Sequence, residues 1–494
     1  MFKKIIGEGR NGVIDLKVSF WVTRFILKFK SQIQSLLQTR MMQQKTIVIV
    51  GGSISGMIAA ATFGPYADKV FIIEKDVINL SDDVALTHRA GTPQDQHLHV
   101  LLEGGREAIE SVLPGFTVLL GINGAQEVDR AKDVQWYHFG LWKTQYLDGG
   151  KNYLLTRPLI DKTVRQLLVK KLGDKLEWIF GKRTVGLTCE DISINGVKLD
   201  DGTYIPSSLV IDATGRSTSA AKWLNDCGFE ITLQSSKVNV ELGYSTMIYE
   251  YPKDFEFPAS VLLVYGGGKN DLKRSGGCLK IKPEAVPGGK GRDNKQYVIC
   301  TIFGYHDDRP VARTNEEYLR IAKLLPTDDL YNIISQGSPL YEKPIPFYYK
   351  SQVRNHWEDV PFLPNGFLSV GDACCSFNPA YAQGMSAAAK GILDCSFLSQ
   401  ELASGKKCSQ ARKIISNRAT VPFLLNSVED FRFEQTTGNA PIFLKLLQSF
   451  NQKAFKAGSK DPEVMKKIYR VFHFQDGITS LFNPAFLLRV LWYG

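Results

Sequence analysis

The segment TIVIVGGSISGMIAAA (residues 46–61) constrains the fold of this chain more than any other stretch of the sequence. An apolar run that suits a buried strand leads into a glycine-rich turn, and small residues that suit a closely packed helix follow. The next apolar run, VFIIEKD (residues 70–76), places Glu74 about twenty residues after the glycines. This order of strand, turn, helix, strand and acidic residue predicts a βαβ unit in a parallel α/β sheet.

The glycine-rich turn also indicates a ligand. A pyrophosphate binds to backbone N–H groups at a helix N-terminus where no side chain is in the way, and a nearby carboxylate binds ribose hydroxyls. Gly51 and Gly56 take the first and third positions of the dinucleotide fingerprint, and Ser53 replaces its middle glycine. Gly52 recovers part of the room that Ser53 takes. We therefore expect Gly51, Gly52, Ser53, Gly56 and Glu74 to contact a dinucleotide.

A second segment, FLSVGDACCSFNPAYAQGMSAAA (residues 367–389), predicts another part of the same site. Its apolar strand stops at Asp372, which places a carboxylate at the sheet edge where α/β folds bind ligands. The turn that follows contains a proline and a glycine, and it aims the free N–H groups of the next helix at a group that develops negative charge. The residues that we expect to contact the ligand here are Gly371, Asp372, Pro379, Gly384 and Met385.

Together these segments resemble the two FAD motifs of the p-hydroxybenzoate hydroxylase fold family. Their sequences are similar to those of a bacterial-type branch of the family, which has RxGxPQxxHxH and GDAxCSFNPxYxQGM stretches. In that family the Gly-Asp pair contacts the ribityl chain of FAD, and the residues after the proline hold the isoalloxazine. The resemblance covers about residues 46–402 and implies FAD as the cofactor, with NAD(P)H as its electron donor.

Two arginines are assigned through the same resemblance. THRAGTPQDQHLHVLLEGG (residues 87–105) is similar to the Arg-Ala-Gly stretch of the family, whose arginine lies beside the cofactor, and this role falls on Arg89. LLTRPLIDKTVRQLL (residues 154–168) begins an amphipathic helix at the point where the family commonly has a further arginine near FAD, which implies that Arg157 binds it too. Surface capping is the alternative for Arg157.

The stretch SLVIDATGRS (residues 208–217) is similar to a third motif of the family, in which an aspartate and a glycine serve FAD. The resemblance assigns this role to Asp212. Two residues separate Asp212 from Gly215, and this spacing is also found in flavin halogenases, lycopene cyclases and geranylgeranyl reductases. The motif therefore supports the fold and leaves the reaction type open.

Two further groups of residues have ordinary structural interpretations. His97 and His99, with Asp95 or Glu103 nearby, admit a metal site, but no second ligand cluster is recognisable in the sequence, so we favour turn and helix-start residues and predict no metal. The Cys374-Cys375 pair admits redox chemistry, and small buried fillers are the favoured interpretation.

Composition excludes several classes of protein. With 494 residues, 44% of them hydrophobic and 22% charged, the chain is expected to be a large globular protein. Its net charge of +10 lacks the clustered basic stripe of a nucleic-acid binder, so no nucleic-acid partner is predicted. The eight cysteines form no CxxC pair or regular framework, which favours a reducing, cytoplasmic compartment.

The first 45 residues form a basic extension that precedes the first predicted strand. Apolar residues recur at helical spacing over residues 18–37, with Arg24 and Lys28 on the other face. Charged residues interrupt this stretch too often for it to span a membrane. Peripheral membrane contact, organelle targeting and packing on the protein's own domain remain open for residues 18–37.

The family arrangement predicts an α/β fold in which a Rossmann-like FAD-binding domain (residues 46–228 and 353–405) is interrupted by a mainly antiparallel sheet (residues 229–352) that binds substrate, with C-terminal helices (residues 406–494). The pattern of short alternating strands and turns in residues 229–352 supports this arrangement. The aromatic residues of this region suit an apolar or aromatic substrate, although core packing explains most of them: Tyr244, Tyr249, Tyr265, Phe303, Tyr305, Phe347, Tyr348 and Tyr349.

The resemblance implies a monooxygenase. Flavin reduced by NAD(P)H, or by a separate flavin reductase, would form a flavin hydroperoxide with O2 and pass one oxygen atom to an apolar aromatic or isoprenoid-like substrate. The sequence marks no catalytic acid or base. A reductase of prenyl double bonds, similar to geranylgeranyl reductases, and a non-enzymatic flavoprotein binding module remain alternatives. A halogenase ranks lower, because its usual Trp-x-Trp-x-Ile-Pro stretch is missing from the sequence.

Overall fold

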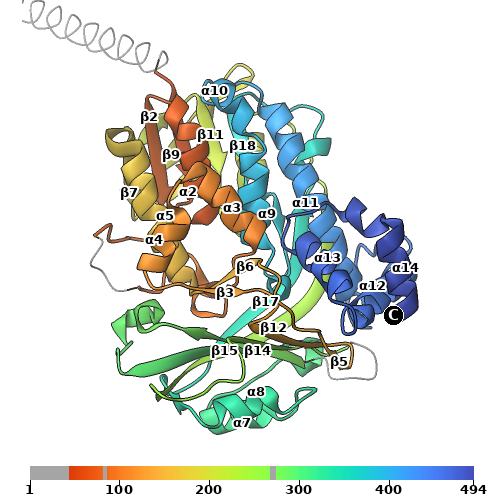
Figure 1. Ribbon diagram of the computed structural model, residues 1–494. Coiled ribbons are helices and arrows are strands. Elements are labelled where there is room, and N and C mark those ends of the chain that lie inside the picture. Colours follow the sequence, from red (N-terminus) through yellow and green to blue (C-terminus); the bar gives the residue numbers. More distant parts are fainter. Residues whose placement is uncertain (1–43, 82–85, 268–273) are drawn as a thin grey trace, which may run out of the picture.

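The computed structural model describes residues 44–81, 86–267 and 274–494 (Figure 1). The predicted amphipathic stretch at residues 18–37 therefore lies outside the described residues. A parallel sheet with its helices occupies one half of the molecule, a large twisted sheet occupies the other, and the C-terminal helices pack at the side (Figure 1). Within the described residues, no helix is both long and apolar enough to cross a membrane.

The parallel sheet has five strands in the order β18-β11-β1-β2-β7. Every residue of its central strand β1 is buried, as expected for a strand that is covered on both faces. Helix α2 (Ile54–Phe63) packs against both α5 (Arg157–Leu172) and α9 (Gly384–Leu393) beside this sheet. The strands of the sheet are β1 (Thr46–Val50), β2 (Lys69–Glu74), β7 (Leu176–Phe180), β11 (Leu209–Asp212) and β18 (Phe367–Ser369).

The second, larger sheet has ten strands and is mostly antiparallel. Its longest strand, β12, pairs with both β15 and β17. Strands β4 and β5 come from outside residues 229–352, and β4 pairs with β13 in parallel. The strands are β4 (Val134–His138), β5 (Leu141–Trp142), β12 (Ser235–Pro252), β13 (Val261–Val264), β14 (Arg274–Ile281), β15 (Lys295–Tyr305), β16 (Ser338–Pro339), β17 (Ile345–Asn355), β19 (Cys375–Ser376) and β20 (Thr437–Gly438).

Two small sheets complete the strands. The pair β3 (Gln126–Asp129) and β6 (Lys151–Leu154) is antiparallel. The three-stranded sheet β8 (Thr184–Glu190), β9 (Ser193–Leu199) and β10 (Tyr204–Pro206) contacts the parallel sheet through β9 and β11.

Helices cover the sheets and form the C-terminal part of the chain. Helices α7 and α8 cover one face of the large sheet, where Tyr318 and Leu330 are fully buried. The helices are α2 (Ile54–Phe63), α3 (Glu103–Val112), α4 (Phe116–Ile122), α5 (Arg157–Leu172), α6 (Ala220–Asp226), α7 (Asn315–Ala322), α8 (Asp329–Ile334), α9 (Gly384–Leu393), α10 (Ser399–Leu402), α11 (Cys408–Asp430), α12 (Leu444–Ala457), α13 (Pro462–Phe472) and α14 (Pro484–Tyr493).

The predicted fold class is confirmed: a parallel α/β unit is combined with a mainly antiparallel sheet and C-terminal helices. The division of the chain at particular residues stays a prediction. The pairing of β4 with β13 shows that the large sheet also includes a segment that the sequence places in the nucleotide-binding part.

Candidate active site

One cavity of about 540 Å³ lies between the parallel sheet, the large sheet and the C-terminal helices. It begins at the carboxyl ends of β1 and β2, where open α/β sheets bind ligands. Its wall continues through β13, β14 and β15 to α13. Its volume lies within the usual range for a ligand site.

The glycines of the β1–α2 turn allow a very close approach of backbone to backbone. Gly51 has φ +108°, and a Cβ atom there would lie 2.4 Å from the carbonyl oxygen of Ala213. A Cβ on Gly56 would lie 2.0 Å from the carbonyl oxygen of Gly51, and one on Gly52 would lie 2.7 Å from the Trp178 ring. Gly51 lines the cavity, whereas Gly52 and Gly56 shape the turn behind it.

Glu74 lines the cavity at the end of β2 and is 5% exposed. Its Oε2 accepts a hydrogen bond from the Gly52 N–H at 2.9 Å, and its Oε1 accepts one from the Asp76 N–H at 3.1 Å. Arg89 forms an ion pair with Glu74 at 2.8 Å. The predicted ribose-binding carboxylate is thus fixed in place beside the glycine turn.

Arg89 lies beside the main cavity and does not line it. It lines a smaller, neighbouring cavity, and Asp76 and Asp161 lie within 4 Å of its guanidinium group. In this position Arg89 orients Glu74, because an ion pair of two buried groups restricts both side chains.

Ser53 and Arg157 line the cavity together. Nη2 of Arg157 donates a hydrogen bond to Ser53 Oγ at 2.9 Å, and Nε donates to Asp161 at 3.3 Å. The serine that replaces the middle glycine therefore has a specific partner, and the guanidinium group brings positive charge next to the N-terminus of α2. An anion at this turn would lie close to both the Arg157 guanidinium group and the N-terminus of α2.

Asp212 lies behind the cavity. Its carboxylate accepts hydrogen bonds from Thr214 and Thr218, and Ser369 on the neighbouring strand also donates to it. The residues that follow it line the cavity instead: Ala213, Thr214, Gly215, Ser217 and Ser219. Asp212 thus holds the loop whose backbone reaches the cavity.

The segment after β18 contributes Asp372, Pro379, Gly384 and Met385 to the cavity wall. Burial raises the pKa of Asp372 above its ordinary value, and Arg216 and Arg157 oppose this shift. Helix α9 begins at Gly384 without a side-chain hydrogen bond that caps it, so its first N–H groups are free for a ligand. Gly371 lies behind the wall, where its φ of +62° lets the chain pass Ser55.

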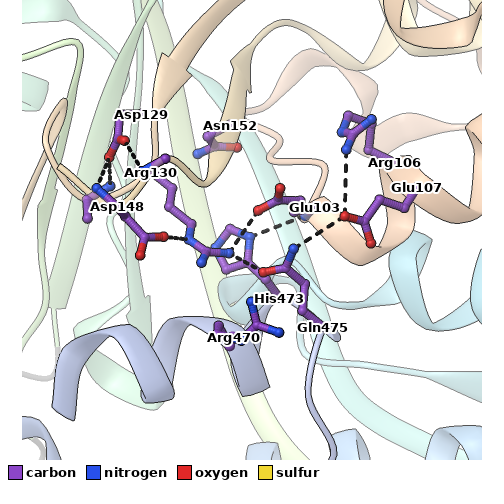
Figure 2. Close-up of polar contacts among 12 residues, drawn as sticks. Glu103, Arg106, Glu107, Asp129, Arg130, Asp148, Asn152, Arg470, His473 and Gln475 are labelled. Atoms are coloured by element: carbon purple, nitrogen blue, oxygen red, sulfur yellow. Dashed lines mark hydrogen bonds and ion pairs between the residues drawn. The ribbon is translucent and has the colours of Figure 1, made fainter. Parts of the chain in front are cut away.

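Sequence reasoning missed a polar corner of the cavity, formed by Arg130, Asn152 and His473 (Figure 2). Arg130 is 3% exposed and forms ion pairs with Glu103, at 2.8 Å, and with Asp148. His473 lies more than 300 residues after Arg130 and Asn152 in the sequence, so no local pattern could have identified this corner.

Two histidines that line the cavity have defined tautomers. Nδ1 of His473 accepts the Glu103 N–H at 3.2 Å, so the ring proton lies on Nε2. His99 is the opposite case: its Nδ1 donates to the His97 carbonyl oxygen at 2.9 Å, which leaves Nε2 as an acceptor. Burial, with Arg130 nearby, lowers the pKa of His473 to about 3, and burial, with Arg157 nearby, lowers that of His99 to about 4.

The remaining predicted residues lie as follows. His97 shares a hydrogen bond with Thr246 Oγ1 at 2.8 Å and packs against Tyr244, which suits the structural interpretation of the His-x-His pair. Cys374 and Cys375 are buried, and burial raises the pKa of both thiols, so they are poor nucleophiles. Among the eight aromatic residues predicted for substrate, those that line the cavity are Tyr244, Tyr265 and Phe303.

These residues fit FAD. Gly51 lines the cavity without a side chain where a pyrophosphate would lie, Glu74 lines it at the end of β2 where a ribose would lie, and the first turn of α9 is free for an anionic ring edge. The cavity connects all three.

No family model matches the chain. Protein Rv3254 of Mycobacterium tuberculosis is 24% identical over 453 residues, which are 87% of this chain and 90% of that protein.

Several solved structures are similar in fold. The flavin-dependent brominase Bmp2 has a TM-score of 0.59 at 13% identity and covers 86% of this chain and 92% of its own. PqsL, described as a probable FAD-dependent monooxygenase from Pseudomonas aeruginosa, has a TM-score of 0.53 at 14% identity, with 86% and 99% covered. A mutant of 2-methyl-3-hydroxypyridine-5-carboxylic acid oxygenase has a TM-score of 0.56 at 13% identity, with 87% and 97% covered. The chain therefore has the fold of these flavin-dependent enzymes.

Proposed function

We propose that this protein is an FAD-dependent monooxygenase that transfers one oxygen atom from O2 to an apolar aromatic or isoprenoid-like substrate. NAD(P)H, directly or through a separate flavin reductase, is the proposed electron donor. The observation that carries the proposal is the single cavity that connects the glycine turn at Gly51 with the aromatic wall at Tyr265 and Phe303. A cofactor at the first end and an apolar compound at the second would share one continuous cavity.

The residues of this chain bind and orient the reactants. Gly51, Ser53 and the N-terminus of α2 hold the pyrophosphate, and Glu74 holds a ribose. When bound, FAD supplies the two-electron chemistry and the reaction with O2. The N-terminus of α9 at Gly384 stabilises negative charge at the ring edge, while the aromatic wall excludes water from the reacting atoms.

The polar corner orients the substrate. Nε2–H of His473 and the amide group of Asn152 are hydrogen-bond donors on a wall that is otherwise mostly apolar. Arg130 forms ion pairs with both Glu103 and Asp148, and these two carboxylates offset its single positive charge. A substrate with an apolar body and one neutral acceptor oxygen, such as a carbonyl, matches this arrangement.

His99 supplies the complementary group, an acceptor. With a pKa near 4, its imidazole is neutral at physiological pH and too weak a base to remove the proton of a phenol. It therefore serves as a hydrogen-bond acceptor for a hydroxyl group, and the proposed reaction uses binding and exclusion of water more than acid–base catalysis.

The test is a flavin and oxygen assay on the purified chain. After reconstitution with FAD, the protein should be yellow and should consume NAD(P)H and O2 in equal amounts when one class in a panel of aromatic and isoprenoid compounds is added. NAD(P)H consumption under anaerobic conditions with a saturated prenyl product would establish the reductase instead. A flavin that NAD(P)H or a flavin reductase cannot bleach would indicate a binding module.

A further inference from the structure

Helix α14 exposes a continuous apolar stripe at the C-terminal end of the chain. Leu488, Leu491 and Trp492 are 68%, 72% and 83% exposed, and their spacing of three and four residues places them on one helix face. The other face packs inward through Phe486 and Val490, which are almost fully buried. One helix therefore has two apolar faces, and only one of them is covered by the described residues.

Basic residues lie near the C-terminal end of this stripe. Nζ of Lys460 donates to the Tyr493 carbonyl oxygen at 3.1 Å, and a Cβ on Gly494 would lie 2.7 Å from the carbonyl oxygen of Lys453. Arg489 lies on α14 itself and pairs with Asp461 at 2.7 Å. Residues 441–460 contain four lysines and no acidic residue, and residues 477–494 contain one arginine and no acidic residue.

We propose that α14 docks the protein onto the surface of an anionic lipid bilayer. The apolar stripe would enter the boundary between headgroups and acyl chains, Trp492 would lie at headgroup level, and Lys453 and Lys460 would meet the acidic headgroups. This combination of an apolar face with basic flanks is typical of interfacial helices.

The area of the stripe favours a bilayer over a second copy of the chain. Three side chains of this size expose roughly 400 Å² at most. A stable protein interface buries about 800 Å² on each partner. Binding to a bilayer does not require this minimum buried area, because the attraction of nearby basic residues to anionic lipids supports the insertion of a few side chains.

The position of α14 connects docking to the cavity. Helix α14 packs on α12 and α13, and the C-terminal end of α13 contributes Tyr469, Phe472 and His473 to the cavity wall. The helical unit that would contact the bilayer is therefore also a wall of the proposed substrate site. The docking proposal itself does not depend on the identity of the reaction.

Vesicle flotation of the full chain tests the proposal. Wild-type protein should float with vesicles of phosphatidylcholine and phosphatidylserine, and should partition about tenfold less into vesicles of phosphatidylcholine alone. The double variant Leu488→Gln/Trp492→Gln should partition about tenfold less than wild type into the anionic vesicles. The matched control is Val118→Gln/Ile122→Gln, since these residues are 69% and 73% exposed on α4 with the same four-residue spacing. The control should float like wild type.

A second pair of residues tests the charge independently of the apolar stripe. Lys453→Gln/Lys460→Gln should lose the preference for phosphatidylserine while its thermal unfolding stays close to that of wild type. The proposal is overturned if Leu488→Gln/Trp492→Gln floats as wild type does, which would assign any binding to another segment such as residues 18–37. It is equally overturned if wild type binds neither vesicle, or if this variant changes only the oligomeric state in gel filtration.

Discussion

Gly51 lies so close to Ala213 that a Cβ atom on Gly51 would come within 2.4 Å of the Ala213 carbonyl oxygen. The ends of β1 and β11 meet at this point, and both residues line the cavity. The contact joins the glycine turn to the loop that Asp212 holds in place, so a change at Gly51 should disturb both parts of the proposed FAD site.

Gly51→Ala should abolish FAD retention and lower thermal stability. The alanine would have to adopt φ +108°, which L side chains rarely do, and its methyl group would clash with backbone that cannot move away alone. The readouts are the flavin absorbance of the purified protein and its melting temperature. Gly186→Ala is the control, because a Cβ there has open space around it. Normal FAD content in Gly51→Ala would refute this role of the turn.

Arg157→Gln should weaken FAD binding by about tenfold or more, since it removes a charge-assisted donor from the turn. Ser53 would also lose its partner. Titration of apoprotein with FAD, followed by quenching of flavin fluorescence, measures the effect. Lys170→Gln removes one positive charge from the exposed face of the same helix and should bind FAD as wild type does. Equal affinities for the two variants would contradict the assignment.

His473→Phe should raise KM for the substrate by about tenfold while FAD content stays unchanged. The phenyl ring removes the Nε2–H donor from the polar corner and costs one hydrogen bond to the substrate. His473→Gln keeps a donor near the same position and should recover part of the loss. Steady-state kinetics with the compound that stimulates oxygen uptake measures both. If His473→Gln and His473→Phe are equally impaired, the donor role is wrong.

The free energy of unfolding should depend on pH through His473. Its pKa is about 3 in the folded protein and near 6.5 when unfolded, so the unfolded chain binds more protons between these values and stability falls as pH decreases. Between pH 7 and pH 5, this histidine alone should lower the free energy of unfolding by about 2 kcal/mol.

Urea unfolding at the two pH values measures this contribution as a difference. Wild type should lose about 2 kcal/mol more than His473→Gln, which does not titrate, and this comparison cancels the other titrating groups. Parallel losses in the two proteins would show that His473 is not buried in its neutral form.

The local parts of this fold were predictable because neighbouring residues determine them. The glycine turn at residues 51–56, the acidic end of β2 and the helix that begins at Gly384 all lie where the sequence places them. Strand periodicity also predicts the antiparallel sheet. It could not predict that β4 joins this sheet, because its pairing with β13 depends on residues more than a hundred positions away.

The side-chain contacts within the site depend on tertiary structure. Arg89 and Asp212 match family motifs. In the structure, however, Arg89 forms an ion pair with Glu74, and the Asp212 carboxylate accepts hydrogen bonds from Thr214 and Thr218. A motif identifies a position in the chain and does not identify the partner of its side chain. The corner around His473 has no sequence signal at all, because it depends on how α13 packs against α3 and the large sheet.

A crystal structure of the protein grown with FAD would show whether the cavity binds this cofactor. We expect electron density for one FAD along the cavity, in contact with Gly51 and Glu74 at one end and with Gly384 at the other. A cavity that stays without FAD at saturating concentration, or FAD bound elsewhere on the protein, would contradict this expectation.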